Sequence, residues 1–411
     1  MTKNTNIIIL SDVPPDPKYT AGQVLHQAIA GLADFRFRFY WLNQSRLDTR
    51  VELPANCTQV AILGTAYGRS IGFLVGACNH LMHRLPSLSR PLVLIKCLLA
   101  CASLITRAVK LGWRLRRDPG TVIWFVIQGE RLVIVSLIAS WLARKPYLLQ
   151  QWDPLSWWMG HRQYPRRVMT VAQRLLSQLE QRARVNIVPS DVWREQLAAQ
   201  GKTAIRLDNF IQQPLLQETR FLAIRDPRAL HAVFVGQFYA GNELIRTVST
   251  LAASVQKNGR ELVIHLFGSS DPVSLDGCQV ISHGLLDRDE LIRRISKWDL
   301  ALLPYPTAAG HEETARLSFP SKARVYLAAG LPILACAPVF SGVHRFLDQH
   351  YPNHYFNVEV MGDANGFVKD LLDASYQTRQ ARFRQARQLV GSLFSDTAEL
   401  LPLRDILGDA A

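Results

Sequence analysis

Short apolar runs alternate with helical patterns along almost the whole chain, and this alternation constrains the fold more than any other feature. In the second half, strands are predicted at His231 to Gly236 and Leu262 to Phe267, with a helix to Lys257 between them, and a later strand at Asp299 to Pro304. Strands separated by helices of this length indicate parallel pairing with helical crossovers. The sequence therefore predicts the α/β class, with doubly wound sheets that bind ligands beyond the carboxyl ends of their strands.

The chain of 411 residues is too long for one ordinary core and suits two domains. Apolar periodicity lapses after Pro214 and resumes at about Ala229, which places a linker there. The predicted domains are residues 1–213 and 229–370. Residues 371–411 follow as a helical C-terminal segment, within a helical pattern that runs from Asn365 to Phe394.

The segment LSFPSKARVYLAAGLPILACA, residues 317–337, predicts a loop, a short helix, a tight turn and a buried strand. Ser321 or Ser318 can cap the helix, and Gly330 can end it. A helix start carries backbone N–H groups and the positive end of the dipole, and Lys322 adds a full charge there. The segment could hold a diphosphate, although Lys322 could also be a solvated residue on an ordinary helix.

The phrases PSK, YLAAG and LPILA resemble the donor-binding segment of GT-B glycosyltransferases. They are closest to the family-4-like and galactofuranosyltransferase-like enzymes, which carry P-x-K-x-x-x-YLAAG-x-P. The resemblance implies two Rossmann-like domains facing a cleft, with residues 371–411 crossing back to brace the first domain. It also implies that Lys322 and the helix start contact the pyrophosphate of a nucleotide sugar.

The resemblance places the donor on the second domain, along one rim of its sheet. The predicted donor-binding residues are Gly236, Gln237, Gly268, His283, Tyr305, Glu312, Ser321 and Lys322.

This sequence departs from the family pattern at four positions. The usual arginine and lysine after the first strand are replaced by Gln237 and approximately Asn242, and the two usual glutamates by Val325 and Leu317. Losing two cations removes charge stabilisation from a leaving diphosphate. Three explanations stay open: Lys322 and the helix starts carry more of this task, the donor differs, or catalysis is reduced.

The nearest replacement carboxylates are Glu312 and Glu313, in the predicted loop AAGHEETARLS. Binding residues concentrate in loops at strand ends, so one of them is predicted to accept a hydroxyl of the donor sugar. Alternatively, both are solvated charges. The predicted catalytic residues are Asp153, Glu313 and Lys322.

The acceptor is expected on the first domain, where Asn6 to Leu10 predicts the first strand and Gly22 follows in the next connection. Asp153 and His161 lie after the strand Tyr147 to Gln151, and a carboxylate at a strand end could orient or deprotonate an acceptor hydroxyl. Family members often have histidine where this chain has Trp152. Gly22 could equally belong to an ordinary connection, and Asp153 could only shape a turn.

The formal net charge of +14 favours phosphates, nucleic acid or an anionic membrane face as partners. No RNA-binding signature is present, so no nucleic-acid partner is predicted. The helix predicted at Pro91 to Arg117 ends in clustered cations beside Trp113. These either complement the helix dipole or bind an anionic bilayer. The apolar tracts Pro91 to Ile105 and Thr121 to Ala143 are too short or too interrupted to span a membrane.

The six cysteines show no disulfide framework, and the N-terminus does not resemble a signal peptide, so a cytoplasmic location is expected, with peripheral contact at the inner membrane face left open. No zinc spacing is present, and neither a metal nor another cofactor is predicted. The predicted function is transfer of a sugar from a nucleotide donor to a glycan or glycolipid hydroxyl, in bacterial cell-surface polysaccharide or glycolipid synthesis. The alternative is a GT-B-like binding or scaffolding subunit that has lost activity.

Overall fold

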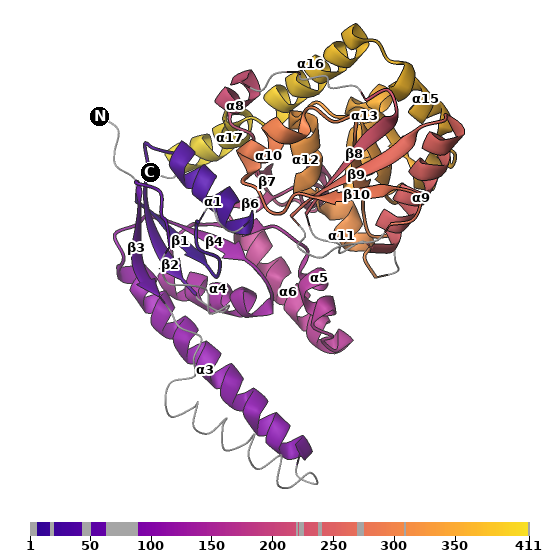
Figure 1. Ribbon diagram of the computed structural model, residues 1–411. Helices are drawn as coiled ribbons and strands as arrows, with labels where there is room; N and C mark the ends of the chain where they lie inside the picture. The colour runs from indigo at the N-terminus through magenta and orange to yellow at the C-terminus, as the bar shows by residue number, and fades with distance from the viewer. Residues whose placement is uncertain are drawn as a thin grey trace. The chain divides into compact units, whose positions relative to one another are not determined.

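The computed structural model describes residues 6–16, 20–42, 51–62, 89–218, 221, 226–236, 241–268, 275–307 and 310–409 (Figure 1). The chain divides into two compact units. Unit 1 consists of Met1–Val188, Arg194–Leu207 and Pro402–Ala411, and unit 2 consists of Pro189–Trp193 and Asp208–Leu401. The division therefore falls near Leu207, and most of the predicted 371–411 segment belongs to unit 2.

Unit 1 contains a parallel sheet whose described strands have the order β3-β2-β1-β4-β5-β6-β7. The strands are β1 (Asn6–Ser11), β2 (Arg36–Trp41), β3 (Cys57–Ile62), β4 (Val122–Ile127), β5 (Tyr147–Gln151), β6 (Val185–Val188) and β7 (Ala204–Arg206). The connecting helices are α1 (Thr20–Gly31), α3 (Ser89–Arg117), α4 (Glu130–Ala143), α5 (Leu155–His161), α6 (Arg166–Arg182) and α7 (Asp191–Ala199). Apolar residues of α3, α4 and α6 form one core with those of β1, β4 and β5.

Unit 2 contains a second parallel sheet, with the described order β10-β9-β8-β11-β12-β13. Its strands are β8 (Ala229–Val235), β9 (Glu261–Phe267), β10 (Gln279–Ser282), β11 (Leu300–Pro304), β12 (Ile333–Cys336) and β13 (Tyr355–Asn357). The helices from α8 onward are α8 (Gln213–Glu218), α9 (Gly241–Lys257), α10 (Arg288–Ile295), α11 (Glu312–Leu317), α12 (Ser321–Ala328), α13 (Gly342–His350), α14 (Val358–Met361), α15 (Asn365–Asp373), α16 (Tyr376–Leu393) and α17 (Asp396–Asp409), which begins in unit 2 and ends in unit 1.

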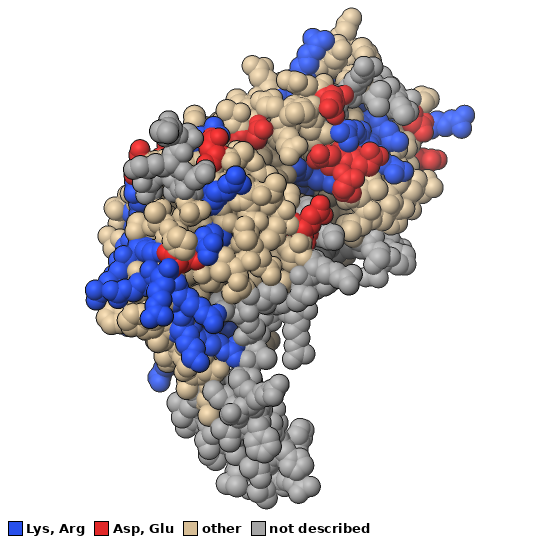
Figure 2. All heavy atoms as spheres, turned by 90° about the vertical axis from the view of Figure 1, so that its left-hand side faces the viewer, with Lys and Arg blue, Asp and Glu red and all other residues tan. Residues whose placement is uncertain are grey.

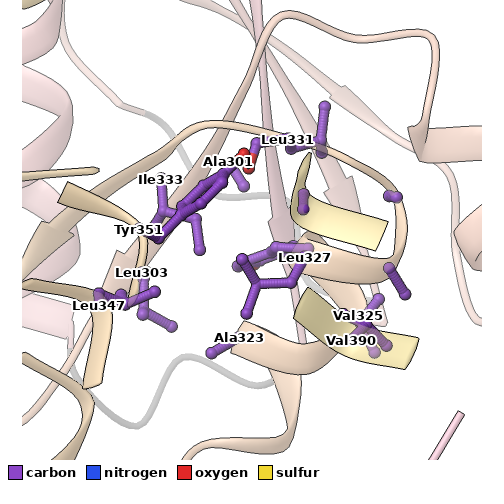
Figure 3. Close-up of a cluster of buried hydrophobic side chains, with 14 of the residues drawn as sticks. Ala301, Leu303, Ala323, Val325, Leu327, Leu331, Ile333, Leu347, Tyr351 and Val390 are labelled. Carbon is purple, nitrogen blue, oxygen red and sulfur yellow. Dashed lines mark hydrogen bonds between the residues drawn. The ribbon is translucent and has the colours of Figure 1, made fainter. Parts of the chain in front are cut away.

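Helix α12 lies in the apolar core of unit 2, in contact with β11 and α16 (Figure 3). Gly330 ends α12 with φ of 73°, and a β-carbon there would lie 2.2 Å from the ring of Phe383. Only glycine can take this conformation in this space without strain. The predicted end of the helix is therefore confirmed, with a packing reason in addition to the backbone one.

The structure confirms two doubly wound α/β units and corrects some local predictions. The helical pattern from 365 to 394 forms two helices, α15 and α16, because the Ser375 side chain accepts a hydrogen bond from the Thr378 N–H and starts a new helix. Glu312 and Glu313 belong to the first turn of α11 and not to a loop. The sequence also predicts a helix at Tyr67 to Leu85, and these residues lie outside the described part of the chain. No helix in the described part of the chain is long and apolar enough to cross a membrane.

Candidate functional site

The strand order reverses at one point in each sheet. In unit 2 this point lies between β8 and β11, and in unit 1 between β1 and β4. Ligands of open parallel sheets bind at such a point, beyond the carboxyl ends of the two strands. The residues that follow these four strands are therefore the first candidates for a binding site in each unit.

Gly236 follows β8 directly and has a φ of 101°, which side chains disfavour. A β-carbon at this position would lie 3.5 Å from Nζ and 3.7 Å from Cε of Lys322, the second residue of α12. The structure thus brings two of the predicted donor-binding residues together. A bare backbone and an ammonium group meet at the switch point, as the binding of a phosphate group requires.

The Lys322 side chain is buried, and its ammonium nitrogen lies 4.5 Å from the centroid of the Phe234 ring. Burial disfavours the charged form and lowers the pKa of Lys322 to about 7. A bound anion would stabilise the ammonium and raise this pKa again. Strongly shifted pKa values of this kind concentrate at functional sites.

Three glycines with positive φ lie at the carboxyl ends of the neighbouring strands β8, β9 and β10, and we name Gly236, Gly268 and Gly284 the glycine edge. A β-carbon on Gly268 would lie 3.2 Å from the α-carbon of Gly236, so the two backbones are in close contact. The Gly268 N–H donates to the Gly284 carbonyl at 2.8 Å, and His283 directly precedes Gly284. A ligand can therefore approach the backbone of this edge closely.

The start of α12 differs from the prediction. Pro320 is the N-cap residue, and no side chain of the described residues caps the helix. Ser321 is the first residue of α12, and Ser318 ends α11. The predicted serine cap is wrong, because the rigid φ of proline sets the helix entry instead. An uncapped start leaves the positive end of the dipole for a ligand.

Tyr305 follows β11 but is buried, and its hydroxyl donates to the Ser318 carbonyl at 3.4 Å. It holds the connection between α11 and α12. Glu312 accepts a hydrogen bond from the Gly310 N–H at 2.8 Å, and the Glu313 side chain is half-buried. Gln237 lies outside the described residues.

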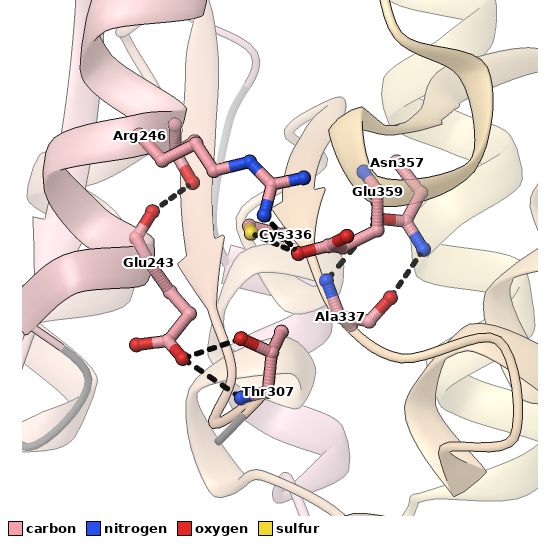
Figure 4. A network of polar contacts seen from close by, with 8 residues as sticks. Glu243, Arg246, Thr307, Cys336, Ala337, Asn357 and Glu359 are labelled. Carbon is pink, nitrogen blue, oxygen red and sulfur yellow. Dashed lines mark hydrogen bonds and ion pairs between the residues drawn. The ribbon is translucent and has the colours of Figure 1, made fainter. Parts of the chain in front are cut away.

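A polar network fixes the carboxyl edge of β11, β12 and β13 (Figure 4). Glu243 of α9 accepts hydrogen bonds from the N–H and the hydroxyl of Thr307 at 2.8 and 2.7 Å. Glu359 pairs with Arg246 and accepts from the Cys336 thiol at 3.5 Å. The bonds of Glu243 join the segment after β11 to α9. The ion pair of Arg246 joins Glu359, in the helix after β13, to the same helix α9.

Val325 and Leu317 replace two glutamates of the family pattern, and both are apolar for a structural reason. Val325 is buried and packs in the same core as Val390 of α16 (Figure 3), and Leu317 is 1% exposed. An unpaired carboxylate at either position would lose its hydration. Carboxylates at these two positions would therefore not face a ligand in this chain.

In unit 1 the residue with the strongest functional signal is Asp12, which sequence analysis did not select. It follows β1 at the switch point, is 7% exposed, and its Oδ1 has no hydrogen-bond partner among the described residues. Burial raises its pKa to about 7, opposed in part by the positive charge of Arg162. The only sequence signal was an acidic residue directly after the first apolar strand.

A second group lies across the same switch point, after β4. Glu130 is buried at the start of α4, accepts from the Tyr164 hydroxyl at 2.8 Å, and pairs with Arg162 at 3.2 Å. A β-carbon on Gly129 would lie 3.7 Å from the same Arg162 nitrogen. Asp12, Glu130 and Arg162 therefore form an acid and base group at the position where a doubly wound sheet binds its ligand.

The residues predicted to face the acceptor lie in α1 and in or next to α5. Asp153 is half-buried directly before the Pro154 that caps α5, and His161 ends α5, where its side chain is not described. Gly22 lies in α1, and a β-carbon there would lie 2.6 Å from the carbonyl oxygens of Pro14 and Asp16. That close approach gives Gly22 a packing reason.

Among the described residues, no group of three or more His, Cys, Asp or Glu side chains is arranged to hold a metal ion.

No protein-family model matches the sequence, and no curated protein matches it. Solved structures are similar over almost the whole chain. Anabaena HepE in complex with UDP and glucose has a TM-score of 0.61 at 14% identity and covers 98% of this chain and 100% of its own. Sucrose-phosphate synthase from Thermosynechococcus elongatus has a TM-score of 0.60 at 15% identity, with 98% of each chain covered. The lipopolysaccharide outer core galactosyltransferase WaaB has a TM-score of 0.56 at 11% identity, covering 99% of this chain and 100% of its own.

At these identities the similarity is evidence of fold. It agrees with the two parallel sheets and their switch points, and the chain has the GT-B fold.

Proposed function

We propose that this protein is a glycosyltransferase of the family-4-like or galactofuranosyltransferase-like type, which transfers a sugar from a nucleotide donor to a hydroxyl acceptor. The observation that carries the proposal is the position of Lys322, whose buried ammonium lies beside Gly236 at the switch point of unit 2. A diphosphate at this position would stabilise the charged form of the ammonium, which burial disfavours. Stabilisation of a leaving diphosphate is the main catalytic task in this chemistry.

The proposed donor is a UDP-sugar. HepE, one of the similar structures, was solved with UDP and glucose, and its fold matches this chain over 98% of its residues. In this chain the glycine edge and the uncapped start of α12 would bind the nucleotide and its phosphates. Glu313 or Glu312, on the first turn of α11, would accept a hydroxyl of the sugar.

The acceptor would bind to unit 1, beside Asp12. A carboxyl group with a pKa of about 7 can take a proton from a hydroxyl near neutral pH and release it again. Asp12 therefore joins Asp153 as a candidate base. Asp12 is favoured by its position at the switch point and by its Oδ1, which has no hydrogen-bond partner among the described residues.

The proposed acceptor is a glycan or glycolipid of the bacterial cell surface, used in the cytoplasm at the inner face of the membrane. Ile105 and Trp113 of α3 are 48% and 46% exposed, and the same helix carries the exposed cations Lys110, Arg114 and Arg117. Figure 2 shows basic side chains gathered on this side of the molecule. A helix that exposes both apolar and basic residues can contact an anionic bilayer.

A catalytically inactive binding subunit is the alternative, favoured by the replaced family residues Gln237, Val325 and Leu317. Calorimetric titration with UDP, GDP, CMP and ADP, followed by a product assay with the corresponding UDP-sugars, tests both. Binding of UDP together with release of UDP from a UDP-sugar supports the transferase. Binding without turnover supports the subunit, and no binding of any nucleotide contradicts the proposed donor site.

A further inference from the structure

Three histidines on neighbouring strands form a continuous hydrogen-bonded chain across the sheet of unit 2. His231 lies on β8, His265 on β9, and His283 just after β10. Nδ1 of His231 lies 2.9 Å from Nε2 of His265, and Nδ1 of His265 lies 2.9 Å from Nε2 of His283. The register pairs Val233 with His265 and His265 with Ile281, so all three side chains lie on one face.

The rings are nearly coplanar, as a chain of in-plane hydrogen bonds requires. The first two ring centroids are 5.2 Å apart at an angle of 25°, and the second two are 5.1 Å apart at 26°. The Trp298 ring stacks on His265 at 3.8 Å and 11°, and Phe267 stacks on His283 at 4.5 Å and 10°. The packing therefore holds the imidazoles in the orientation that the hydrogen bonds need.

A carboxylate at one end gives the chain a direction. Oδ2 of Asp226 lies 3.6 Å from Nε2 of His231, and a carboxylate can only accept a hydrogen bond. Nε2 of His231 therefore carries the proton, and its Nδ1 accepts from Nε2–H of His265. Nδ1 of His265 in turn accepts from Nε2–H of His283, which leaves Nδ1 of His283 as an acceptor.

Burial, and then nearby positive charges, lower the pKa values of His265 and His283 and so disfavour their charged forms. Arg294 and Lys297 face His283, and Lys297 also faces His265, so both oppose a further positive charge. At the other end, Asp299 accepts from the backbone N–H of His231 and is paired with Arg379 at 3.0 Å. A neutral imidazole has one donor and one acceptor nitrogen, so each histidine transmits the direction set by Asp226.

The end of the histidine chain at His283 lies next to the glycine edge in the sequence. His283 is followed by Gly284, whose carbonyl accepts from the N–H of Gly268. The side chain of His283 is half-buried, and no hydrogen bond from the described residues reaches its Nδ1. His283 therefore adjoins the edge where the proposed function places the nucleotide.

We propose that Asp226, His231 and His265 are positioning residues that present Nδ1 of His283 as a hydrogen-bond acceptor for a donor group of the bound nucleotide. The inference rests on the proposed function, because that function supplies the ligand. The donor group is either a ribose hydroxyl or the N3–H of uracil. Both present a hydrogen to an acceptor nitrogen, so the chain selects a ligand that donates at this point.

The first test measures imidazole tautomers in the full-length protein without ligand, by nitrogen-resolved NMR. The expected result is that His231, His265 and His283 all carry the proton on Nε2, and that Asp226→Ala gives His283 a measurable population protonated on Nδ1. Asp363→Ala is the matched control, because Asp363 caps the same kind of turn, accepting from Asn365 N–H at 3.0 Å as Asp226 accepts from Arg228 N–H at 2.8 Å. An Nδ1 proton on wild-type His283, or no effect of Asp226→Ala, overturns the chain.

The second test is calorimetric titration with UDP. Asp226→Ala and His283→Phe should each weaken binding about 3- to 10-fold, the loss of one ordinary hydrogen bond, while Asp363→Ala has no effect. The probes 2′-deoxy-UDP and N3-methyl-UDP each lack one possible donor group. The probe that lacks the group bonded to His283 should bind the wild type weakly, and His283→Phe should not weaken its binding further. Full UDP affinity in His283→Phe overturns the ligand contact alone. If wild type binds no UDP, the proposed function fails together with that contact, and the tautomers still decide the hydrogen-bonded chain.

Discussion

Nζ of Lys322 lies 3.5 Å from the point that a β-carbon on Gly236 would occupy, so the start of α12 and the end of β8 meet at one position. In the proposed donor site, Lys322 would supply charge, and Gly236 would supply backbone and space for a diphosphate.

Lys322→Met should weaken UDP binding about 10- to 150-fold, because a charge-assisted hydrogen bond contributes roughly 1.5 to 3 kcal/mol. Methionine keeps the apolar stem of the side chain, so the fold should persist. Lys257→Met, at an exposed position at the end of α9, is the control and should leave the affinity unchanged. Calorimetry checks both, and equal affinities of wild type and Lys322→Met would contradict the phosphate contact.

The free energy of unfolding without ligand should rise with pH from about 7 towards 10.5 through Lys322. Its pKa falls from 10.5 to about 7 on folding, so in this window the unfolded chain binds the additional proton. The slope from one such group is at most about 1.4 kcal/mol per pH unit. Urea denaturation at several pH values should show this slope in wild type and its loss in Lys322→Met. A saturating nucleoside diphosphate should reduce it, since a bound anion raises the pKa.

Asp12→Asn should lower turnover about 100- to 10,000-fold, the usual contribution of a general base, without changing UDP affinity. The amide keeps the size of the carboxyl group but cannot take a proton. Asp153→Asn is the matched comparison from sequence analysis. If Asp153→Asn abolishes turnover and Asp12→Asn does not, the base is Asp153, and the raised pKa of Asp12 reflects burial alone.

Glu312→Gln and Glu313→Gln test the sugar contact. At least one should reduce turnover of the nucleotide sugar about 10- to 100-fold, because a charge-assisted hydrogen bond is lost, while UDP still binds normally. Full turnover in both variants would show that the sugar binds elsewhere.

Binding to vesicles with anionic lipid should weaken by about 1 kcal/mol for each of Lys110 and Arg114 replaced by glutamine, and added salt should release the protein. Trp113→Ala should weaken binding to neutral and anionic vesicles alike, because it removes buried apolar area. Arg345→Gln in unit 2 is the control. Equal binding of wild type to neutral and anionic vesicles would contradict an electrostatic contact.

The sequence by itself determined most of the strands and their order along the chain. The strand Tyr147–Gln151 was predicted with its observed bounds, and Gly330 ends α12 as predicted. These features depend on local apolar periodicity and on the backbone freedom of glycine, which neighbouring residues encode. Local sequence also explains why the N-cap of α12 was predicted wrongly, since a proline and two serines near the helix start are all possible cap residues.

The tertiary structure alone decided which residues meet and in what environment. Asp12 has no unusual sequence context, and its pKa of about 7 arises because the residues packed around it exclude water. The histidine chain needs the register of three strands, and Val325 faces α16 because of how α12 docks. Such contacts join residues far apart in the sequence, so they depend on the packing of the whole unit, which no local pattern specifies.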